Sequence, residues 1–297
     1  MSRVNPCCGK YGLSMDIKFT DKCNGSCSFC IEKNGYRSKT VLTANELAAK
    51  ANSMKVNNYL IVGGEPTLRC DLPEFLSKLN KRSYITTNGS NLTPDLARRL
   101  SPYLFAINIS IHHYNEQVNS SIFKHDISLD NIRRSIWIFN KKNVPVRINC
   151  NLIPGFIDNR SDVDKMINFA INIGAQSIRF TELQNQPEFV NAQNIWSELP
   201  IEPFKDGCEH WINSFVLVKQ TCGIVNKKKP YPDDISKRKG STIVLYPDGS
   251  FGSWAVGDHG CHGLPMGDNC HPAPNSDEEE CHPTPRSNEE ECHPGSG

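Results

Sequence analysis

The sequence predicts an α/β fold: a partial (β/α)6 TIM-like barrel, followed by a small C-terminal extension and a disordered tail. Short runs rich in β-branched and aromatic residues alternate with amphipathic helical stretches from Leu13 to Glu182. This alternation is typical of a parallel sheet covered by helices. Six units are too few for a closed eight-stranded barrel, so one side should be open and able to admit a large substrate.

The predicted elements follow in chain order. Strands are expected at residues 13–19, 59–62, 84–86, 105–110, 146–151 and 177–180. The first helix should begin at a capping box, Thr43 to Glu46, and the third at Thr93 with Pro94 in the first helical position. The other helices are expected at residues 72–80, 130–140 and 162–173.

The rest of the chain breaks this rhythm. Residues 1–12 form an N-terminal segment, residues 13–185 the βα core, and residues 186–256 the C-terminal extension. In the extension, Ser241–Tyr246 and Ser250–Trp254 should pair as a hairpin, because Pro247, Asp248 and Gly249 between them favour a turn.

Residues 257–297 form a tail in which Cys-His-Pro and Glu-Glu-Glu recur every eleven residues. Its Pro-rich, acidic composition cannot bury a core, so we expect disorder. Cys-His pairs at Cys261, Cys270, Cys281 and Cys292 are suited to metal binding. The tail is alternatively a fused substrate peptide modified in cis, or an expanded repeat without a function.

Charge divides the chain in two. The tail carries nine acidic residues and one arginine, a net charge of −8, and the remaining chain is therefore +9. A basic body of this kind attracts an anionic substrate or docks its own tail, unless the charges merely form a solvated surface.

Neither secretion nor membrane insertion is expected. The N-terminal residues contain no apolar signal region, and no stretch approaches the roughly 20 apolar residues that span a bilayer. A cytoplasmic location is expected, where the thirteen cysteines serve as metal ligands or free thiols.

Polar motifs follow the predicted strands, at the edge where parallel βα folds gather their reactive groups. Strand one leads into Cys23-Asn24-Gly25-Ser26-Cys27-Ser28-Phe29-Cys30, and strand two into Gly63-Gly64-Glu65-Pro66. The next strands lead to Thr87-Asn88-Gly89, Ser110, Asn149 and Glu182.

The loop's cysteines, Cys23, Cys27 and Cys30, can wrap a compact iron-sulfur cluster. A cubane has four irons, so three thiolates leave one iron open to an outside molecule. A structural zinc site is the alternative, but it would require a fourth Cys or His, and none follows within the loop.

This Cys-x-x-x-Cys-x-x-Cys loop, with Phe29 before the last cysteine, resembles the signature of the radical S-adenosylmethionine (SAM) superfamily. The match covers about residues 13–185, with the motifs in the family's order. The resemblance implies that SAM chelates the open iron of a 4Fe-4S cluster. Reductive cleavage then gives a 5′-deoxyadenosyl radical that abstracts a substrate hydrogen.

The resemblance also implies roles for individual residues. Gly63, Gly64, Glu65 and Pro66 match the segment that contacts the methionine amino group. Phe29 would lie near the adenine, and Thr87, Asn88, Ser110 and Asn149 would hold the ribose and carboxylate. Turn formation or strand-end capping is the structural alternative for the polar residues.

Residues 147–155 and 178–183 look most like the branch that contains the molybdenum-cofactor GTP cyclase and many peptide-modifying enzymes. The cyclase carries a second cluster on a C-terminal Cys-x-x-Cys and ends in Gly-Gly. This chain has isolated Cys208, Cys222 and Cys261 and ends Gly-Ser-Gly. With an open partial barrel, a basic body and a small extension, the leading prediction is a peptide-modifying maturase of ribosomally made natural products.

Two alternatives remain: a radical SAM enzyme acting on a nucleotide or small anionic metabolite, and a metal-binding or iron-sulfur protein without catalysis. An auxiliary cluster on Cys208, Cys222 and Cys261, with Cys70, Cys7 or Cys8, competes with ordinary thiols. His112, with neighbouring His113, and Glu182 are candidate catalytic residues at strand ends. Expected partners are a substrate peptide, a flavodoxin or ferredoxin, and a separate leader-peptide-binding protein.

Overall fold

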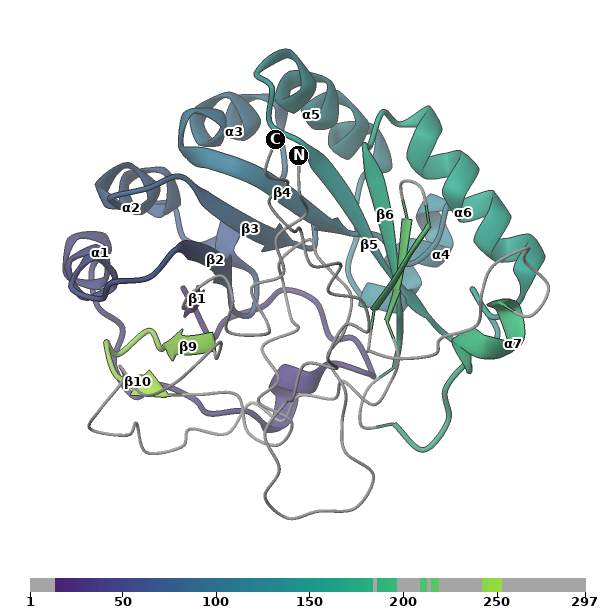
Figure 1. Cartoon of the computed structure of the whole chain (residues 1–297), viewed down its shortest axis with the longest axis horizontal. Helices are drawn as coiled ribbons and strands as arrows, with labels where there is room; N and C mark the ends of the chain where they lie inside the picture. The colour runs from purple at the N-terminus through teal and green to yellow at the C-terminus, as the bar shows by residue number, and fades with distance from the viewer. Residues whose placement is uncertain (1–13, 184–185, 197–208, 213–214, 219–241, 253–297) are drawn as a thin grey trace, which may run out of the picture.

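Six parallel strands separated by helices form the centre of the computed structural model (Figure 1). The structure describes residues 14–183, 186–196, 209–212, 215–218 and 242–252. The six central strands are β1 (Ser14–Lys18), β2 (Asn58–Val62), β3 (Ser83–Thr87), β4 (Leu104–Ser110), β5 (Val146–Leu152) and β6 (Ser177–Glu182). The helices are α1 (Ala44–Asn52), α2 (Leu72–Lys78), α3 (Pro94–Leu100), α4 (Glu116–Phe123), α5 (Leu129–Lys141), α6 (Arg160–Asn172) and α7 (Ala192–Trp196).

Four further strands extend the sheet at both ends. They are β7 (Glu209–Ile212), β8 (Phe215–Val218), β9 (Thr242–Leu245) and β10 (Phe251–Gly252). The described strands lie in the order β10-β9-β1-β2-β3-β4-β5-β6-β8-β7. The two outermost strands, β10 and β7, run antiparallel to their neighbours. The sheet is therefore parallel in its centre and not closed, as the predicted partial barrel requires.

The six predicted strands and five predicted helices are confirmed, with small shifts at their ends. Thr43 forms the predicted capping box with Glu46, and the Thr93 side chain accepts a hydrogen bond from the Leu96 N–H. Helix α4, which follows the two histidines, was not predicted. Its N-cap, Asn115, accepts from the Val118 N–H, but eight residues are too short for a clear helical period.

The predicted hairpin is also confirmed, and its position in the fold is new. Strands β9 and β10 pair antiparallel, and the Gly249 N–H donates to the Tyr246 carbonyl across the turn at 2.9 Å. Strand β9 then pairs in parallel with β1, so the hairpin extends the main sheet. Residues 1–13 and the acidic tail lie outside the described residues.

The two faces of the sheet differ in chemistry because side chains alternate along each strand. The outer face packs against the helices through apolar residues such as Met15, Ile17, Ile109 and Ile148. Figure 1 shows α1, α2, α3, α5 and α6 arranged in an arc around this face.

The inner face of the sheet carries several buried polar and charged side chains. It carries Asp16 and Lys18 on β1, Asn108 on β4, Arg147 on β5 and Arg179 on β6, and all five are buried. Among the described residues, no helix is both long and apolar enough to cross a bilayer.

Candidate active site

The cysteine loop follows β1 and turns around Gly25. The Cys23 and Cys27 sulfur atoms each lie 3.7 Å from the position that a Gly25 Cβ would occupy. Burial, and then the neighbouring Cys30 and Cys23, raises the pKa of the Cys27 thiol to about 11, and burial also raises the pKa of Cys23. Because thiolates are the metal-binding form, a bound cation would be needed to hold Cys23 and Cys27 deprotonated.

The donor set fits an iron-sulfur cluster better than a single ion. Within the described ranges, no three His, Cys, Asp or Glu side chains are grouped as they would be around one metal ion. A cubane binds each thiolate to a different iron, so its ligands stand further apart than those of zinc. Cys23, Cys27 and Cys30 of this loop can supply three such ligands.

Gly63 and Gly64 allow the loop to rest directly on the end of β2. The Gly64 N–H donates to the Thr20 carbonyl and the Glu65 N–H to the Lys22 carbonyl, both at 2.8 Å. A Cβ on Gly63, whose φ is +140°, would stand 2.4 Å from the Thr20 oxygen. A Cβ on Gly64 would stand 2.1 Å from the Lys22 oxygen. Only glycine fits at either position.

Glu65 is buried, and its carboxylate joins the ends of β2 and β3. One oxygen accepts from the Thr67 N–H at 3.0 Å and from the hydroxyls of Thr67 and Thr87 at 2.5 and 2.6 Å. The other oxygen accepts from the Asn88 N–H at 2.7 Å. Burial raises the pKa of Glu65 even though these hydrogen bonds lower it. These contacts give Glu65 a structural role besides the predicted one toward SAM, and Pro66 begins the short helical turn beside it.

Lys18, on the inner face of the sheet, forms ion pairs at both ends of the cysteine loop. Its ammonium group is fully buried and lies 2.9 Å from the Asp21 carboxylate and 2.7 Å from that of Glu32. Asp21 precedes Cys23 by two residues, and Glu32 follows Cys30 by two. One cation therefore ties together the two ends of the loop.

The same lysine connects the loop to the C-terminal hairpin. Lys18 also donates to the Tyr36 carbonyl at 2.8 Å. The Tyr36 ring packs edge-on against Tyr246 at 4.7 Å, and its hydroxyl donates to Asp248 at 2.6 Å. The hairpin thus braces the segment that leaves the cysteines.

Replacing Lys18 by methionine should lower the free energy of unfolding by about 3–5 kcal/mol, because two mostly buried carboxylates would lose their counter-ion. Urea unfolding measures this loss. Lys165→Met, which removes an exposed ion pair with Asp162, is the matched control and should change stability little. Similar losses in both variants would contradict the role given to Lys18.

Asn24 connects the middle of the loop to the residues that follow β3 and to those that follow α4. Its amide donates to the Ser90 hydroxyl at 2.8 Å and lies 3.1 Å from His125 Nε2, while its oxygen accepts from the Asn88 amide at 2.9 Å. The Ser26 N–H donates to the Phe123 carbonyl at 2.8 Å. The cysteine loop is therefore held on both sides.

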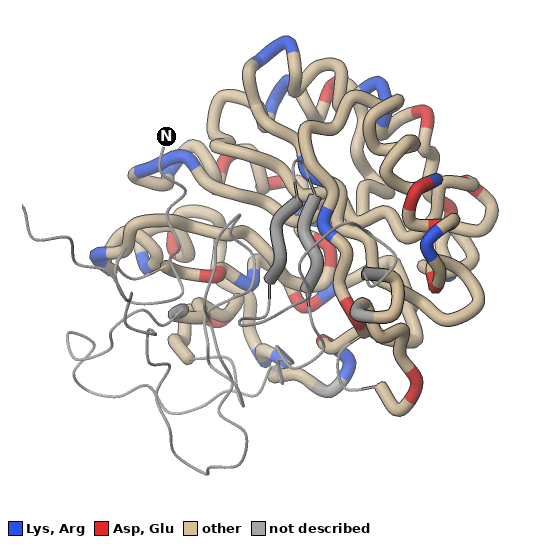
Figure 2. The backbone as a smooth tube through the Cα atoms, turned by 45° about the vertical axis from the view of Figure 1, so that its right-hand side comes forward, with Lys and Arg blue, Asp and Glu red and all other residues tan. Residues whose placement is uncertain are grey.

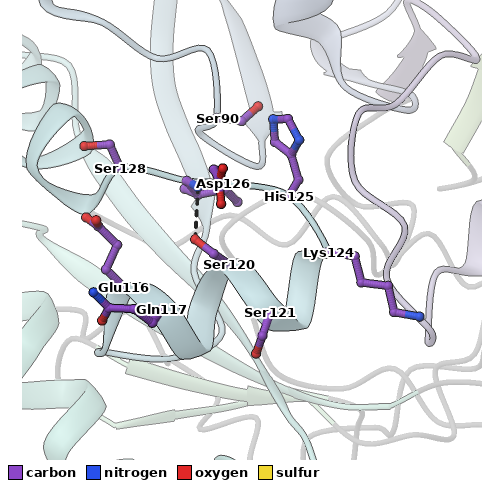
Figure 3. Close-up of a pocket in the computed structure, with 10 residues that line it drawn as sticks. Ser90, Glu116, Gln117, Ser120, Ser121, Lys124, His125, Asp126 and Ser128 are labelled. Atoms are coloured by element: carbon purple, nitrogen blue, oxygen red, sulfur yellow. Dashed lines mark hydrogen bonds between the residues drawn. The ribbon is translucent and has the colours of Figure 1, made fainter.

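A cavity of about 770 Å³ adjoins this contact. Figure 3 shows its lining, in which Ser120 accepts a hydrogen bond from the Ile127 N–H at 3.0 Å at the end of α4. Ser90 and His125 line the cavity and also contact Asn24. The cavity is thus a surface feature next to the cysteine loop.

Ser110 and Asn149 lie side by side on β4 and β5, and Asn149 pairs in register with Arg179 on β6. The Asn149 Oδ1 atom is buried and has no hydrogen-bond partner in the described part of the chain. Since a buried carbonyl oxygen without a donor is unfavourable, this position fits a ligand that carries a donor group.

Phe29, within the cysteine loop, packs against His112, which follows β4. Their rings meet edge to face at 5.2 Å, and His112 stacks on Phe123 at 4.8 Å. His112 Nδ1 accepts from the Asn151 N–H at 3.1 Å. Burial lowers the pKa of His112 to about 3, so it is neutral at physiological pH. This environment favours a packing role over proton transfer.

His112 should make stability pH-dependent. Its pKa is about 3 in the folded chain and about 6.5 when unfolded, so between these values only the unfolded state binds the proton. The contribution is fully present above pH ~6.5 and falls as pH drops, by roughly 2 kcal/mol near pH ~5. His112→Asn should flatten this part of a stability-against-pH curve measured by urea unfolding, and an unchanged slope would contradict the interpretation.

Glu182 lies on the outer, helix-covered face of the sheet, opposite to Asn149 and Arg179. It is adjacent in register to Leu152 of the outer core, and its carboxylate accepts from the Ala192 N–H at the start of α7 at 2.8 Å. Alternation along β6 turns it away from Asn149 and Arg179. These contacts give Glu182 a structural role, which holds α7 against the sheet, and its catalytic role stays a prediction.

The other predicted ligands are dispersed or not described. Cys70 is exposed, whereas Cys7, Cys8, Cys208, Cys222 and Cys261 lie outside the described residues. Lys18, Asn24 and His125 were missed from the sequence. A lysine that alternates with Met15, Ile17 and Phe19 in the first strand, with acidic residues flanking the cysteines, was the available signal for the first of them.

Comparison with known proteins gives the following matches. The model of the radical SAM superfamily matches residues 17–170. GTP 3′,8-cyclase of Aquifex aeolicus is 28% identical over 192 residues, which cover 61% of this chain and 58% of that protein. The probable GTP 3′,8-cyclase of Sulfurisphaera tokodaii is 31% identical over 186 residues, which cover 59% of this chain and 58% of that protein. The chain thus spans about 58% of the length of these relatives.

Among solved structures, Streptococcus suis SuiB bound to precursor peptide SuiA superposes with a TM-score of 0.57 and 14% identity, over 86% of this chain and 62% of that one. SuiB alone superposes with a TM-score of 0.55 and 14% identity, over 82% of this chain and 60% of that one. At such low identity the likeness shows the shared fold.

Proposed function

The chain belongs to the radical SAM superfamily, and from this premise we propose that it is an enzyme that modifies a peptide. Enzymes of this family use a 4Fe-4S cluster and SAM, which together supply, when bound, a 5′-deoxyadenosyl radical that abstracts hydrogen from a substrate. In our proposal, Cys23, Cys27 and Cys30 hold the cluster. The surrounding SAM site consists of Phe29, Gly63, Gly64, Glu65, Pro66, Thr87, Asn88, Ser110 and Asn149.

The protein's own residues hold these groups in place. Gly63 and Gly64 allow the backbone of the cysteine loop to approach β2, and Lys18 fixes its two ends. Asn149 offers a buried acceptor on the inner face of β5, in register with Ser110 at the end of β4. Phe29 and His112 pack against each other beside this edge of the sheet and fix the position of the Phe29 ring.

The choice of a peptide as the substrate rests on the extent of the structural likeness. The superposition on the peptide-bound SuiB structure covers 86% of this chain, well beyond residues 17–170 of the family match. The sheet also ends in two separate outer strands, β10 and β7, which leaves it open. An open sheet admits an extended chain more easily than a closed barrel does.

A nucleotide is the second candidate. The curated relatives are named GTP 3′,8-cyclases, and Arg147 and Arg179 place two buried cations on the inner face. Arginine suits phosphate recognition. However, no Cys-x-x-Cys occurs in this chain after Cys30, so the cyclase's second-cluster motif is missing.

An external reductant has to supply the electron, and we propose a flavodoxin or ferredoxin. Lys22, Lys33, Arg37 and Lys39 are exposed around the cysteine loop, whereas Asp21 and Glu32 turn inward to Lys18. The exposed charge is therefore positive and suits an acidic donor. A separate leader-peptide-binding protein remains a prediction.

An anaerobic assay with reconstituted protein, SAM and a strong reductant tests the proposal. Formation of 5′-deoxyadenosine is compared without substrate, with GTP, and with a peptide extract of the cells in which this protein occurs. Stimulation by the peptide extract alone is expected. Stimulation by GTP alone would support the second candidate, and no product from protein that carries a full cluster would contradict both.

A further inference from the structure

A basic groove with an exposed tryptophan lies on the outer helices, away from the strand ends. Its volume is about 540 Å³, and its lining includes Arg98 of α3 and Arg133, Arg134 and Trp137 of α5. Figure 2 shows Lys and Arg segments on the helices at the top of the view. We call this feature the Trp137 groove.

The groove carries a surplus of positive charge. Residues 94–100 and 129–142 contain six basic and two acidic residues. One carboxylate, that of Asp130, lies 2.6 Å from Arg133 and 3.0 Å from Arg134, so a single negative charge serves two guanidinium groups. The remaining charge favours an acidic ligand.

Trp137 gives the groove an apolar contact surface. The residue is 59% exposed, and the Lys141 ammonium lies 5.5 Å from its ring centre. Pro94, Ile138 and Ile173 also line the groove. Tryptophan and arginine together are the residue types most enriched at the energetic centres of protein interfaces. The fitting ligand therefore combines negative charge with apolar rings.

We propose that this ligand is the chain's own acidic repeat tail. Residues 270–297 contain seven acidic residues and one arginine. Pro272-Ala273-Pro274 precedes Glu278-Glu279-Glu280, and Pro283-Thr284-Pro285 precedes Glu289-Glu290-Glu291. Prolines pack well on aromatic rings, and glutamates form charge-assisted hydrogen bonds with arginine. Each repeat thus offers both kinds of contact.

The connecting chain is long enough. Pro272 lies twenty residues beyond Gly252, the last described position. Such a segment spans at most about 66 Å, whereas a domain of this size has a radius of gyration of about 18 Å. Binding in cis needs only weak contacts, because the tether keeps the tail at a high effective concentration. The tail is therefore held on the helical side of the barrel.

Binding of a labelled synthetic peptide of residues 270–291, measured by fluorescence anisotropy under reducing conditions, tests this proposal. The full-length chain is compared with a full-length variant in which the six glutamates of the two triplets are changed to glutamine. The peptide should bind the variant about tenfold more tightly, because the native tail competes for the groove. Equal affinities would overturn the proposal.

Substitutions in the groove locate the binding site. In the glutamine variant, Trp137→Ala and the pair Arg98→Glu and Arg133→Glu should each weaken peptide binding about tenfold or more. The pair Lys55→Glu and Lys78→Glu changes equal charge elsewhere on the surface and should have little effect. Equal losses from both pairs would mean non-specific attraction and would overturn the proposed groove.

Cross-linking separates the tail from a second copy. A carbodiimide should join Lys141 to the tail glutamates in the wild-type chain. In an equal mixture of ¹⁴N- and ¹⁵N-labelled protein, links within one isotope are expected. Links mostly between isotopes would assign the groove to the tail of another copy and overturn binding in cis.

Discussion

Replacing Cys27 by alanine should remove iron from the reconstituted protein and abolish the formation of 5′-deoxyadenosine. The cysteine loop offers three thiolates, and a cubane held by only two of them loses an anchored iron. The loss should be complete rather than partial, because ligands of one centre act as a unit. Iron content and the absorption of the cluster measure it without reference to activity.

Ser28→Ala is the matched control for this change. Ser28 is exposed in the same loop, one residue from Cys27, and is assigned no ligand role. Iron content should be unchanged in this variant. A Cys27→Ala protein that keeps a full cluster and SAM cleavage would show that the ligands lie elsewhere, for example among the cysteines outside the described residues.

The order of strands and helices could be predicted because it depends on local chemistry. Alternating residues mark a strand, and caps such as Thr43 and Thr93 satisfy the first N–H groups of a helix regardless of the rest of the fold. The cysteine loop and Gly63-Gly64 could be placed together for a similar reason, since parallel strands bring their carboxyl ends to one edge.

Long-range pairing could not be predicted in this way. Strand β9 joins β1 although over 200 residues separate them, and nothing local in the hairpin specifies that partner. The contact of Glu182 with α7 could not be predicted because the end of a strand has two faces, and a shift of one residue exchanges them. Lys18 was missed because its two carboxylate partners come from opposite ends of the cysteine loop.

Gly64→Ala should lower the free energy of unfolding by more than about 5 kcal/mol, a loss that is exceptional for one methyl group. The added Cβ would meet the Lys22 carbonyl oxygen at 2.1 Å and its carbon at 2.4 Å. Both are backbone atoms, so no side-chain rotation relieves the contact. The Glu65–Lys22 and Gly64–Thr20 hydrogen bonds would have to break, and the loop would leave the end of β2.

Gly155→Ala separates this effect from simple backbone strain. Gly155 has a positive φ, +78°, which Gly64 lacks, and nothing lies within 4 Å of its Cβ position. It should therefore lose only about 1–2 kcal/mol, the usual penalty of a left-handed conformation. Equal losses in the two variants, measured by urea unfolding, would mean that the close contact at Gly64 costs no more than a left-handed conformation does, and would contradict the prediction. A much larger loss for Gly64→Ala, accompanied by loss of iron, would show that close backbone contact with β2 holds the cysteines in place.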